Sequence, residues 1–186
     1  YRKYFDGPNS LDYKNNLVVL ELDHLKGKKH LQQVVLLQLI AQLNNEFYLG
    51  DRRVPKILLV DEAWEAFEDP MVAKFLEGAF RRMRKAAAAP VVVTQSLRDL
   101  YNSASGEAIA NNAANVIVLR QNGEAIEALK ESGRFNIGDY GYEMLKSLHT
   151  EPGQYSEVLF RSGTAWGGGR FVVDRFSQLL YARMAS

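Results

Sequence analysis

The spacing of the apolar residues in this chain alternates between that of β-strands and that of helices. Apolar residues at helical spacing fill residues 30–49, over about five turns, and residues 70–85, which open on Asp69-Pro70; two further helical patterns follow residue 121. Four short runs between these helical patterns have the length and composition of buried strands, at 17–22, 56–63, 90–96 and 115–121. Strands alternating with helices indicate βαβ units, so we expect an α/β fold built on a parallel sheet with helices on both faces.

Composition excludes several classes of protein. With 186 residues, 47% hydrophobic and 24% charged, the chain is expected to form one globular domain over residues 1–186. It has no cysteine, which excludes a disulfide scaffold, and its net charge of +1 provides no global attraction to nucleic acid or to anionic membranes. No run approaches the roughly 20 apolar residues of a membrane helix. The start lacks both a methionine and a signal-peptide core, and we interpret it as internal to a longer protein.

The last third of the chain has a different pattern. Two strand-like runs, 154–163 and 167–176, are separated by the segment "SGTAWGGG" at 162–169, which predicts a hairpin with a glycine-rich turn; helical spacing resumes at 175–184. Three consecutive glycines also suggest a phosphate-binding loop. However, they are followed by Arg170 and a strand, whereas a P-loop is followed by Lys-Ser/Thr and a helix, so we favour a hairpin turn.

Two adjacent carboxylates end the apolar strand of the segment "KILLVDEAWEAF". Asp61 and Glu62 are either a strand end that meets solvent or part of a metal and water site, because a charge is costly to bury without partners. Ligands bind at the carboxyl ends of parallel strands, and in P-loop NTPases an Asp at this point holds Mg²⁺. A Glu that follows it is placed to polarise the attacking water.

The next strand ends in neutral groups able to form hydrogen bonds. Thr94 and Gln95 close the run "VVVTQS", and we expect them beside the acidic pair, where they can sense a γ-phosphate or orient water. Between the two strands, four basic residues gather near the end of a helix, where the macrodipole favours them in any case: Arg81, Arg82, Arg84 and Lys85. Trp64 either packs under the following helix, which we favour, or stacks on a base.

Six segments in this order resemble a known family. They are "KILLVDEAWEAF", "FLEGAFRRMRK", "VVVTQSLRDLY", "LRQNGEAIEALKESGRF", "LKSLHTEPGQYSEVLFRSG" and "VDRFSQLLYA". Together they cover nearly the whole chain and resemble the C-terminal ATPase domain of the TraC family, the conjugal-transfer ATPases of F-type type IV secretion systems. That family resembles the VirB-type secretion ATPases and, more remotely, the HerA/FtsK group of RecA-like motors. The resemblance implies a RecA-like P-loop NTPase core with a C-terminal β-hairpin and helix.

The resemblance also implies roles for individual residues. Asp61 matches the magnesium-side carboxylate of Walker B, and Glu62 matches the catalytic base or water orienter. Gln95 matches the sensor glutamine that contacts the nucleotide, with Thr94 beside it. Arg84 stands eleven residues before Gln95, where related coupling ATPases carry an arginine that reaches the neighbouring subunit's nucleotide. The implied ligands are ATP and Mg²⁺.

Partners and location follow from the resemblance too. Members of the family are cytoplasmic ATPases, peripheral to the bacterial inner membrane, that form homo-oligomers, often hexamers. They work with inner-membrane components of the secretion apparatus and energise pilus assembly and the transfer of DNA or protein. Two alternatives stay open: a nucleic-acid-binding module that uses the basic residues and Arg98, with salt-dependent binding, and a structural assembly piece without catalysis.

This chain departs from the family pattern at two places. The Walker A motif, G-x-x-x-x-G-K-S/T, is absent from all 186 residues, and we expect it upstream of Tyr1, so that this chain alone is inactive. The segment "KAAAAP" replaces the aromatic residue and glycines that relatives carry after the basic helix. The resemblance implies that the Walker A strand lies between the strand ending in Gln95 and the strand at 115–119. Because that strand is missing here, we expect residues 116–119 to close directly onto residues 91–94, with a strand from another chain as the alternative.

Overall fold

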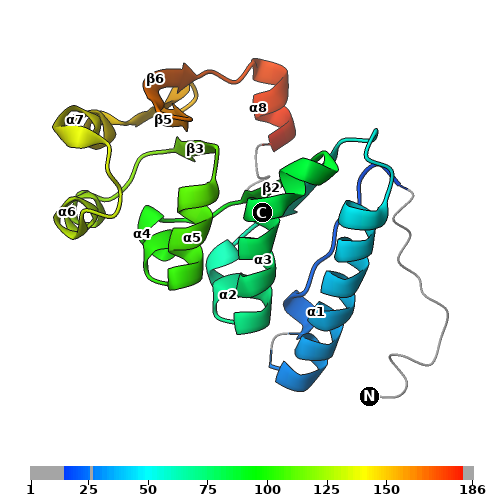
Figure 1. Ribbon diagram of the computed structural model, residues 1–186. Coiled ribbons are helices and arrows are strands. Elements are labelled where there is room, and N and C mark those ends of the chain that lie inside the picture. The colour runs from blue at the N-terminus through cyan, green and yellow to red at the C-terminus, as the bar shows by residue number, and fades with distance from the viewer. Residues whose placement is uncertain (1–14, 26, 182–186) are drawn as a thin grey trace. The chain divides into compact units, whose positions relative to one another are not determined.

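The computed structural model describes residues 15–25 and 27–181 (Figure 1). The chain divides into two compact units, with the boundary in the sequence between Asp51 and Arg52. In the first unit, a short 3-10 helix η2 (Asp23–Leu25) precedes the long helix α1 (Lys29–Asn44), and one π-helical turn, η3 (Asn45–Leu49), continues it. The expected helix over 30–49 is therefore confirmed.

The expected strand over 17–22 is wrong. Residues 17–22 form no strand, and the large apolar side chains of Leu17, Val18, Val19 and Leu20 are exposed. A β-branched sequence becomes a strand only when a neighbouring strand accepts and donates the backbone hydrogen bonds of a ladder. No such neighbour is paired with this segment in the described part of the chain.

The second unit begins with a parallel pair of strands. β1 (Lys56–Val60) pairs with β2 (Ala88–Val92) from Lys56 opposite Ala88 to Val60 opposite Val92. Three helical segments connect the two strands: α2 (Ala63–Phe67), α3 (Pro70–Arg82) and the 3-10 helix η4 (Met83–Ala86). This crossover is the βαβ unit that the sequence predicts, and the α/β fold class with parallel strands is confirmed.

Local signals explain where the crossover helix begins and ends. The Asp69 carboxylate accepts hydrogen bonds from the backbone N–H groups of Met71 and Val72, and Pro70 occupies the first helical position, where its missing N–H costs nothing. At the other end, Ala87 adopts the left-handed conformation, with φ 53°, that usually falls to glycine. The segment "KAAAAP" therefore makes a helix-ending turn without a glycine.

One face of the strand pair is packed and the other is exposed. Helix α3 packs against β2 and buries Leu76 and Ala79. The side chains of the opposite face are exposed, and Ile57 retains 71% of its accessible surface. The exposed side chains on this face are Ile57, Leu59, Val91 and Val93.

The rest of the second unit contains a group of helices and an antiparallel sheet. The helices are α4 (Leu97–Tyr101), α5 (Ala104–Asn112), α6 (Gly123–Ser132), α7 (Gly138–Ser147) and α8 (Arg175–Tyr181); the strands are β3 (Asn115–Val118), β4 (Thr150–Glu151), β5 (Tyr155–Ser162) and β6 (Ala165–Phe171). Strand β5 pairs with β3 and β4 along one edge and with β6 along the other. The expected strand over 115–121 and the C-terminal hairpin and helix are present; the part of the expected helix beyond residue 181 lies outside the described residues.

The main hydrophobic core lies between these helices and the antiparallel sheet. It includes Leu97 and Tyr101 from α4, Ile126 and Leu129 from α6, and Leu159 from β5. Phe135, in the loop between α6 and α7, stacks edge-on against Trp166 of β6, with ring centroids 5.4 Å apart. Leu97, the first residue of α4, belongs to this core, so packing anchors the chain two residues after Gln95.

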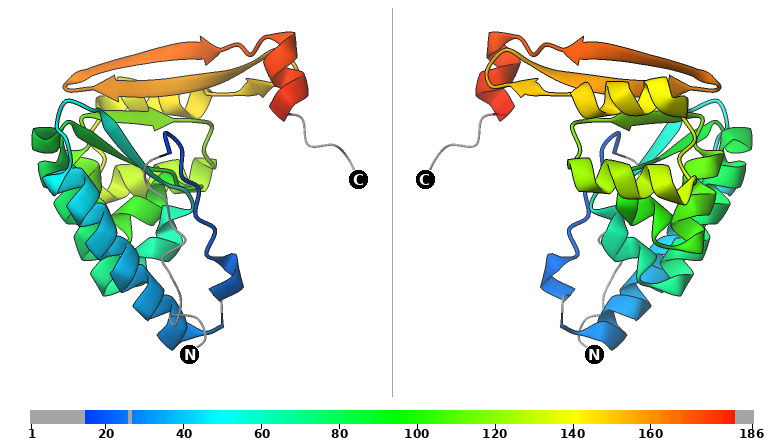
Figure 2. Two further views of the ribbon diagram at one scale, coloured as in Figure 1. Left: turned by 90° about the vertical axis from the view of Figure 1, so that its right-hand side faces the viewer. Right: turned by 90° about the vertical axis from the view of Figure 1, so that its left-hand side faces the viewer.

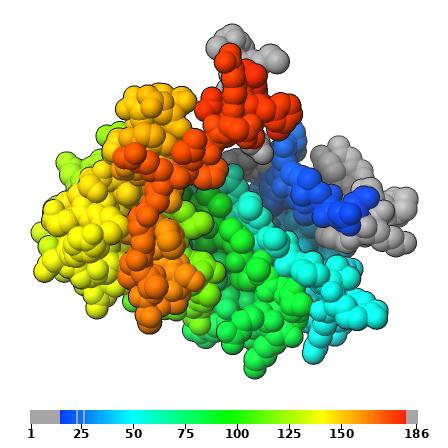
Figure 3. All heavy atoms as spheres, turned by 90° about the horizontal axis from the view of Figure 1, so that it is seen from above, coloured from blue at the N-terminus to red at the C-terminus, as the bar shows by residue number. Residues whose placement is uncertain are grey.

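The glycine-rich stretch does not form the hairpin turn. Ser162 pairs with Ala165, so the turn is Gly163-Thr164, while Gly167–Gly169 lie inside β6. Figure 2 shows the hairpin as two long orange strands. These glycines leave room for their neighbours, because a Cβ atom at Gly167 would lie 2.9 Å from the Phe160 ring. Figure 3 shows the hairpin, in orange, beside the yellow atoms of α7. No helix follows the three glycines directly, as a P-loop would require.

The expected closure of residues 116–119 onto residues 91–94 is wrong. Within the described residues β2 pairs only with β1, and β3 pairs only with β5. The segments that follow β2 and β3 are linked instead through a side chain. The side-chain oxygen Oε1 of Gln121 accepts a hydrogen bond of 3.1 Å from the Leu97 backbone N–H. An antiparallel partner already satisfies one edge of β3, and the parallel pair and the antiparallel sheet remain separate.

Candidate functional site

The candidate site lies at the carboxyl end of the parallel strand pair. Backbone bonding continues beyond the strands, because the Val93 N–H donates to the Val60 carbonyl at 2.9 Å and the Ala63 N–H donates to the Val93 carbonyl at 3.0 Å. This extended ladder brings the residues after β1 alongside those after β2. The two strand ends singled out in the sequence, Asp61-Glu62 and Thr94-Gln95, are therefore neighbours, as expected.

Glu62 is the centre of the site. Its backbone is left-handed, with φ 49°, so the chain turns sharply between β1 and α2. The Gln95 side-chain amide donates to both carboxylate oxygens of Glu62, at 2.9 Å to Oε1 and 3.2 Å to Oε2. The Trp64 indole N–H donates to Oε2 at 2.6 Å. The Glu62 carboxylate is thus held by donors from two different segments of the chain.

Asp61 offers an exposed carboxylate beside Glu62. Its Oδ1 accepts the Glu62 backbone N–H at 2.9 Å, which fixes the side chain at the strand end. Among residues 15–25 and 27–181, no three acidic, histidine or cysteine side chains gather closely enough to hold a metal ion by themselves. Mg²⁺ typically binds through one or two carboxylates together with waters and substrate phosphates, so the carboxylate oxygens here fit that ion.

Thr94 is half-buried and supports the start of the next helix. Its hydroxyl donates to the Ser96 carbonyl at 3.0 Å. Ser96 in turn caps α4 in a capping box, in which its side chain accepts a backbone N–H of the first turn and the Asp99 carboxylate accepts the Ser96 N–H. In this structure Thr94 therefore helps to place Gln95 between β2 and α4.

The structure does not bring Arg84 to the carboxyl end. Arg84 lies in η4, before β2 begins, and so at the amino end of the strand pair. Its side chain is exposed, as is that of Lys85. Of the other basic residues near it, Arg81 forms a 2.8 Å ion pair with Glu77 on the same helix. Within one chain, acidic and basic groups thus occupy opposite ends of the β1–β2 pair.

Trp64 is the site residue that the sequence interpretation missed. We favoured packing for this side chain, yet its N–H bonds to Glu62 and the residue keeps 37% of its accessible surface. The sequence does place Trp64, whose side chain can only donate a hydrogen bond, two residues after the carboxylate of Glu62. That spacing brings the two side chains together only because the backbone of Glu62 is left-handed.

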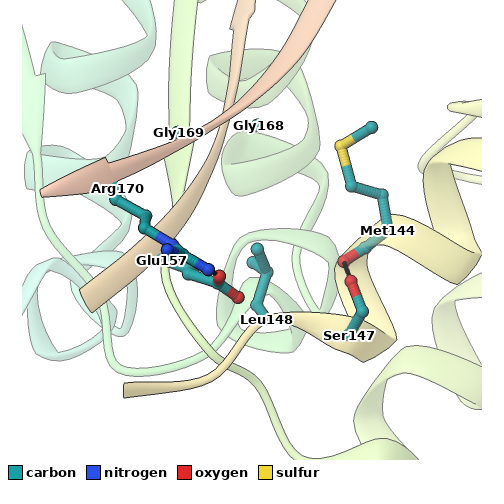
Figure 4. Close-up of a pocket in the computed structure, with 7 residues that line it drawn as sticks. All are labelled: Met144, Ser147, Leu148, Glu157, Gly168, Gly169 and Arg170. Carbon is teal, nitrogen blue, oxygen red and sulfur yellow. Dashed lines mark hydrogen bonds and ion pairs between the residues drawn. The ribbon is translucent and has the colours of Figure 1, made fainter. Parts of the chain in front are cut away.

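A surface pocket elsewhere in the second unit is separate from the candidate site. Its volume is about 380 Å³, and none of the predicted site residues lines it (Figure 4). On one wall the Glu157 carboxylate accepts a 3.2 Å bond from Arg170 and lies 2.8 Å from the His149 ring. Partial burial acts to raise the pKa of Glu157, and the bonds from Arg170 and from the His149 backbone outweigh it, so the pKa is lower than usual.

Comparison with known proteins identifies the family. The model of the TraG P-loop domain family matches residues 5–159, so the chain belongs to that family. More particularly, the chain is 29% identical to Protein TraC of Escherichia coli (strain K12) over 142 residues, which are 73% of this chain and 16% of TraC. The resemblance to the TraC family stated from the sequence is thereby confirmed.

A solved structure shares the fold. VirB4 of Thermoanaerobacter pseudethanolicus superposes with a TM-score of 0.66 at 21% identity, over 92% of this chain and 46% of VirB4. This likeness confirms the fold, and the family match identifies it as a P-loop domain. The chain spans less than half the length of either relative. No helix within the described residues is both long and apolar enough to cross a membrane.

Proposed function

We propose that this chain supplies the water-activating part of an ATPase in a conjugative type IV secretion system. The observation that carries the proposal is the meeting of the Glu62 carboxylate with the Gln95 amide at the carboxyl end of parallel strands. In P-loop NTPases the nucleotide's phosphates bind at this end of the sheet, and a residue there orients the attacking water.

Each residue has a distinct task in this proposal. Glu62 accepts a proton from the attacking water, and Gln95 keeps the carboxylate aligned while its amide faces the γ-phosphate. Asp61 is the carboxylate on the side of Mg²⁺, which when bound neutralises phosphate charge. The family's Walker A segment, absent from these 186 residues, would hold the β- and γ-phosphates. Without that segment the chain alone binds ATP weakly and does not hydrolyse it.

The proposal extends to the assembled protein. Subunits form a homo-oligomer, such as a hexameric ring, in the cytoplasm at the inner membrane. There they act with membrane components of the secretion apparatus on DNA or protein. The separation of Arg84 from Glu62 within one chain supports action of Arg84 on a neighbouring subunit's nucleotide. A head-to-tail contact of this kind closes into a ring.

The test is a pair of substitutions in the full-length protein. Glu62→Gln preserves the shape of the side chain and loses the base, so turnover is expected to fall about 100-fold or more while nucleotide binding is retained. Asp61→Asn is expected to raise the Mg²⁺ concentration that turnover requires. ATP hydrolysis at varied Mg²⁺ and binding of a labelled nucleotide measure the two effects. Wild-type turnover in both variants would refute the assignment.

A further inference from the structure

The indole of Trp64 makes a contact that packing does not explain. A tryptophan side chain has one polar atom, the Nε1 donor, and here that N–H points at Glu62 Oε2 from 2.6 Å. The distance is short for an N–H···O bond and is typical of bonds to a charged acceptor. The single hydrogen bond that this side chain can donate is therefore directed at the centre of the candidate site.

Neighbouring residues account for the packing of α2. Ala63, the first residue of the helix, is fully buried, and it is the side chain that anchors α2 at this point. Trp64 is 37% exposed and lies outside the main hydrophobic core. A residue that serves chiefly as a packing anchor would show the reverse pattern, with a buried ring and an incidental N–H bond.

Glu62 needs outside donors to hold one orientation. Its side chain has three rotatable bonds, and its left-handed backbone sets where that side chain leaves the strand end. The Gln95 amide reaches both oxygens from the segment after β2, and Trp64 reaches Oε2 from the first turn of α2. Donors on two sides hold the plane of the carboxylate more firmly than either donor does by itself.

We propose that Trp64 is a positioning residue for Glu62. Its indole N–H fixes the carboxylate in the orientation that water activation requires, together with Gln95. The inference rests on the proposed function and adds a residue to it. Because the role depends on one N–H group, removing that group is expected to lower kcat for ATP hydrolysis and to leave the KM for ATP nearly unchanged.

The first experiment removes the N–H in the full-length protein. Trp64→Phe keeps an aromatic ring, and replacement of Trp64 by benzothienylalanine keeps the bicyclic shape with sulfur in place of N–H. Both are expected to lower kcat about 10- to 100-fold, the scale of a misplaced catalytic group, with the KM for ATP within about twofold. Trp166→Phe, the matched control on β6, lies outside the site and is expected to keep wild-type kcat. Wild-type kcat in the benzothienylalanine protein would overturn the inference.

The second experiment reads the contact without catalysis. The NMR resonance of the Trp64 indole N–H is assigned by its loss in Trp64→Phe. It is expected to lie downfield in the wild-type protein and to move upfield in Glu62→Gln, because the bond to a charged acceptor is lost. Glu65→Gln, which alters the next acidic side chain along α2, is the charge-matched control and is expected to leave the resonance in place. An indole N–H chemical shift that does not change in Glu62→Gln would contradict the positioning role. If the wild-type protein hydrolyses no ATP, the proposed function fails, and this resonance still shows whether Trp64 holds Glu62.

Discussion

At the scale of single residues, Gly106 marks a very close approach between two helices. It is buried in the first turn of α5, and its backbone N–H donates a hydrogen bond to the hydroxyl of Ser103, the residue that caps this helix. A Cβ atom built at Gly106 would lie 2.1 Å from the backbone oxygen of Leu100 in α4. Backbone atoms have little freedom to give way, so α4 and α5 pack at this distance only because residue 106 has no side chain.

Gly106→Ala is expected to destabilise the protein by about 1–3 kcal/mol, the usual cost of overpacking. Gly123→Ala is the matched control, because a Cβ atom there meets nothing within 4 Å and the residue begins helix α6. That change is expected to be neutral or to stabilise by up to about 1 kcal/mol, through a less flexible unfolded chain. Urea denaturation of both variants measures the difference, and equal midpoints would contradict the packing explanation.

The sequence predicted most of the candidate site at this scale, and what it missed depends on backbone geometry. The positions of Asp61, Glu62 and Gln95 follow from strand ends that share one edge of a parallel sheet. The role of Trp64 does not follow from spacing, because only the left-handed backbone at Glu62 turns the carboxylate toward the indole. A non-glycine residue with positive φ leaves no periodic pattern in a sequence.

At the scale of elements, helix α8 depends on one carboxylate. Asp174 accepts the Ser177 hydroxyl at 2.7 Å and the backbone N–H groups of Phe176 and Ser177. The Ser177 hydroxyl bond, followed by the backbone bonds, holds the pKa of Asp174 below its usual value. A carboxyl whose folded pKa is depressed stabilises the folded state above its unfolded pKa, and this contribution disappears as the pH falls through the folded pKa.

We therefore expect the first turn of α8 to loosen when the pH falls below about 4. The Ser177 amide resonance and its hydrogen exchange, followed from about pH 6 to pH 2, measure the loss. Asp174→Asn keeps an oxygen acceptor at the cap and cannot titrate, so its α8 is expected to show no such transition over this range. The same transition in both proteins would show that another group is responsible.

Elements bounded by strong local signals were predicted correctly, and those that depend on distant partners were not. Helix α3 begins at Asp69-Pro70 as its capping residues indicate. The run at 17–22 has strand composition but no paired neighbour, and composition does not encode pairing. The three glycines of β6 were assigned to a turn because glycine is common both in turns and where a strand passes close to an aromatic ring such as Phe160.

At the scale of the whole molecule, the opposite placement of Glu62 and Arg84 allows a test in mixed oligomers. Each proposed active site combines Glu62 of one subunit with Arg84 of the next. Arg84→Ala subunits and Glu62→Gln subunits are each expected to be nearly inactive, and mixing them is expected to regenerate some sites with both residues intact. ATP hydrolysis is measured after subunit exchange, with mixing confirmed by native mass spectrometry.

The control replaces the Glu62→Gln partner with a subunit that carries both substitutions, which supplies no intact Arg84. This second mixture is expected to stay inactive at every ratio. Recovery in both mixtures would indicate that Arg84 is not needed from the neighbour. No recovery in either, in oligomers that are verified to be mixed, would argue that Arg84 acts within its own subunit.

The left-handed backbone at Glu62 means that a substitution which stabilises the whole molecule can also remove its proposed activity. An L-residue in this conformation costs roughly 1–2 kcal/mol that glycine avoids. Directed evolution scored only on thermal tolerance would therefore favour Glu62→Gly and discard the carboxylate at the centre of the site. Variants of this chain selected for robustness need a parallel screen for turnover, because a glycine at residue 62 relieves backbone strain and removes the carboxylate in one step.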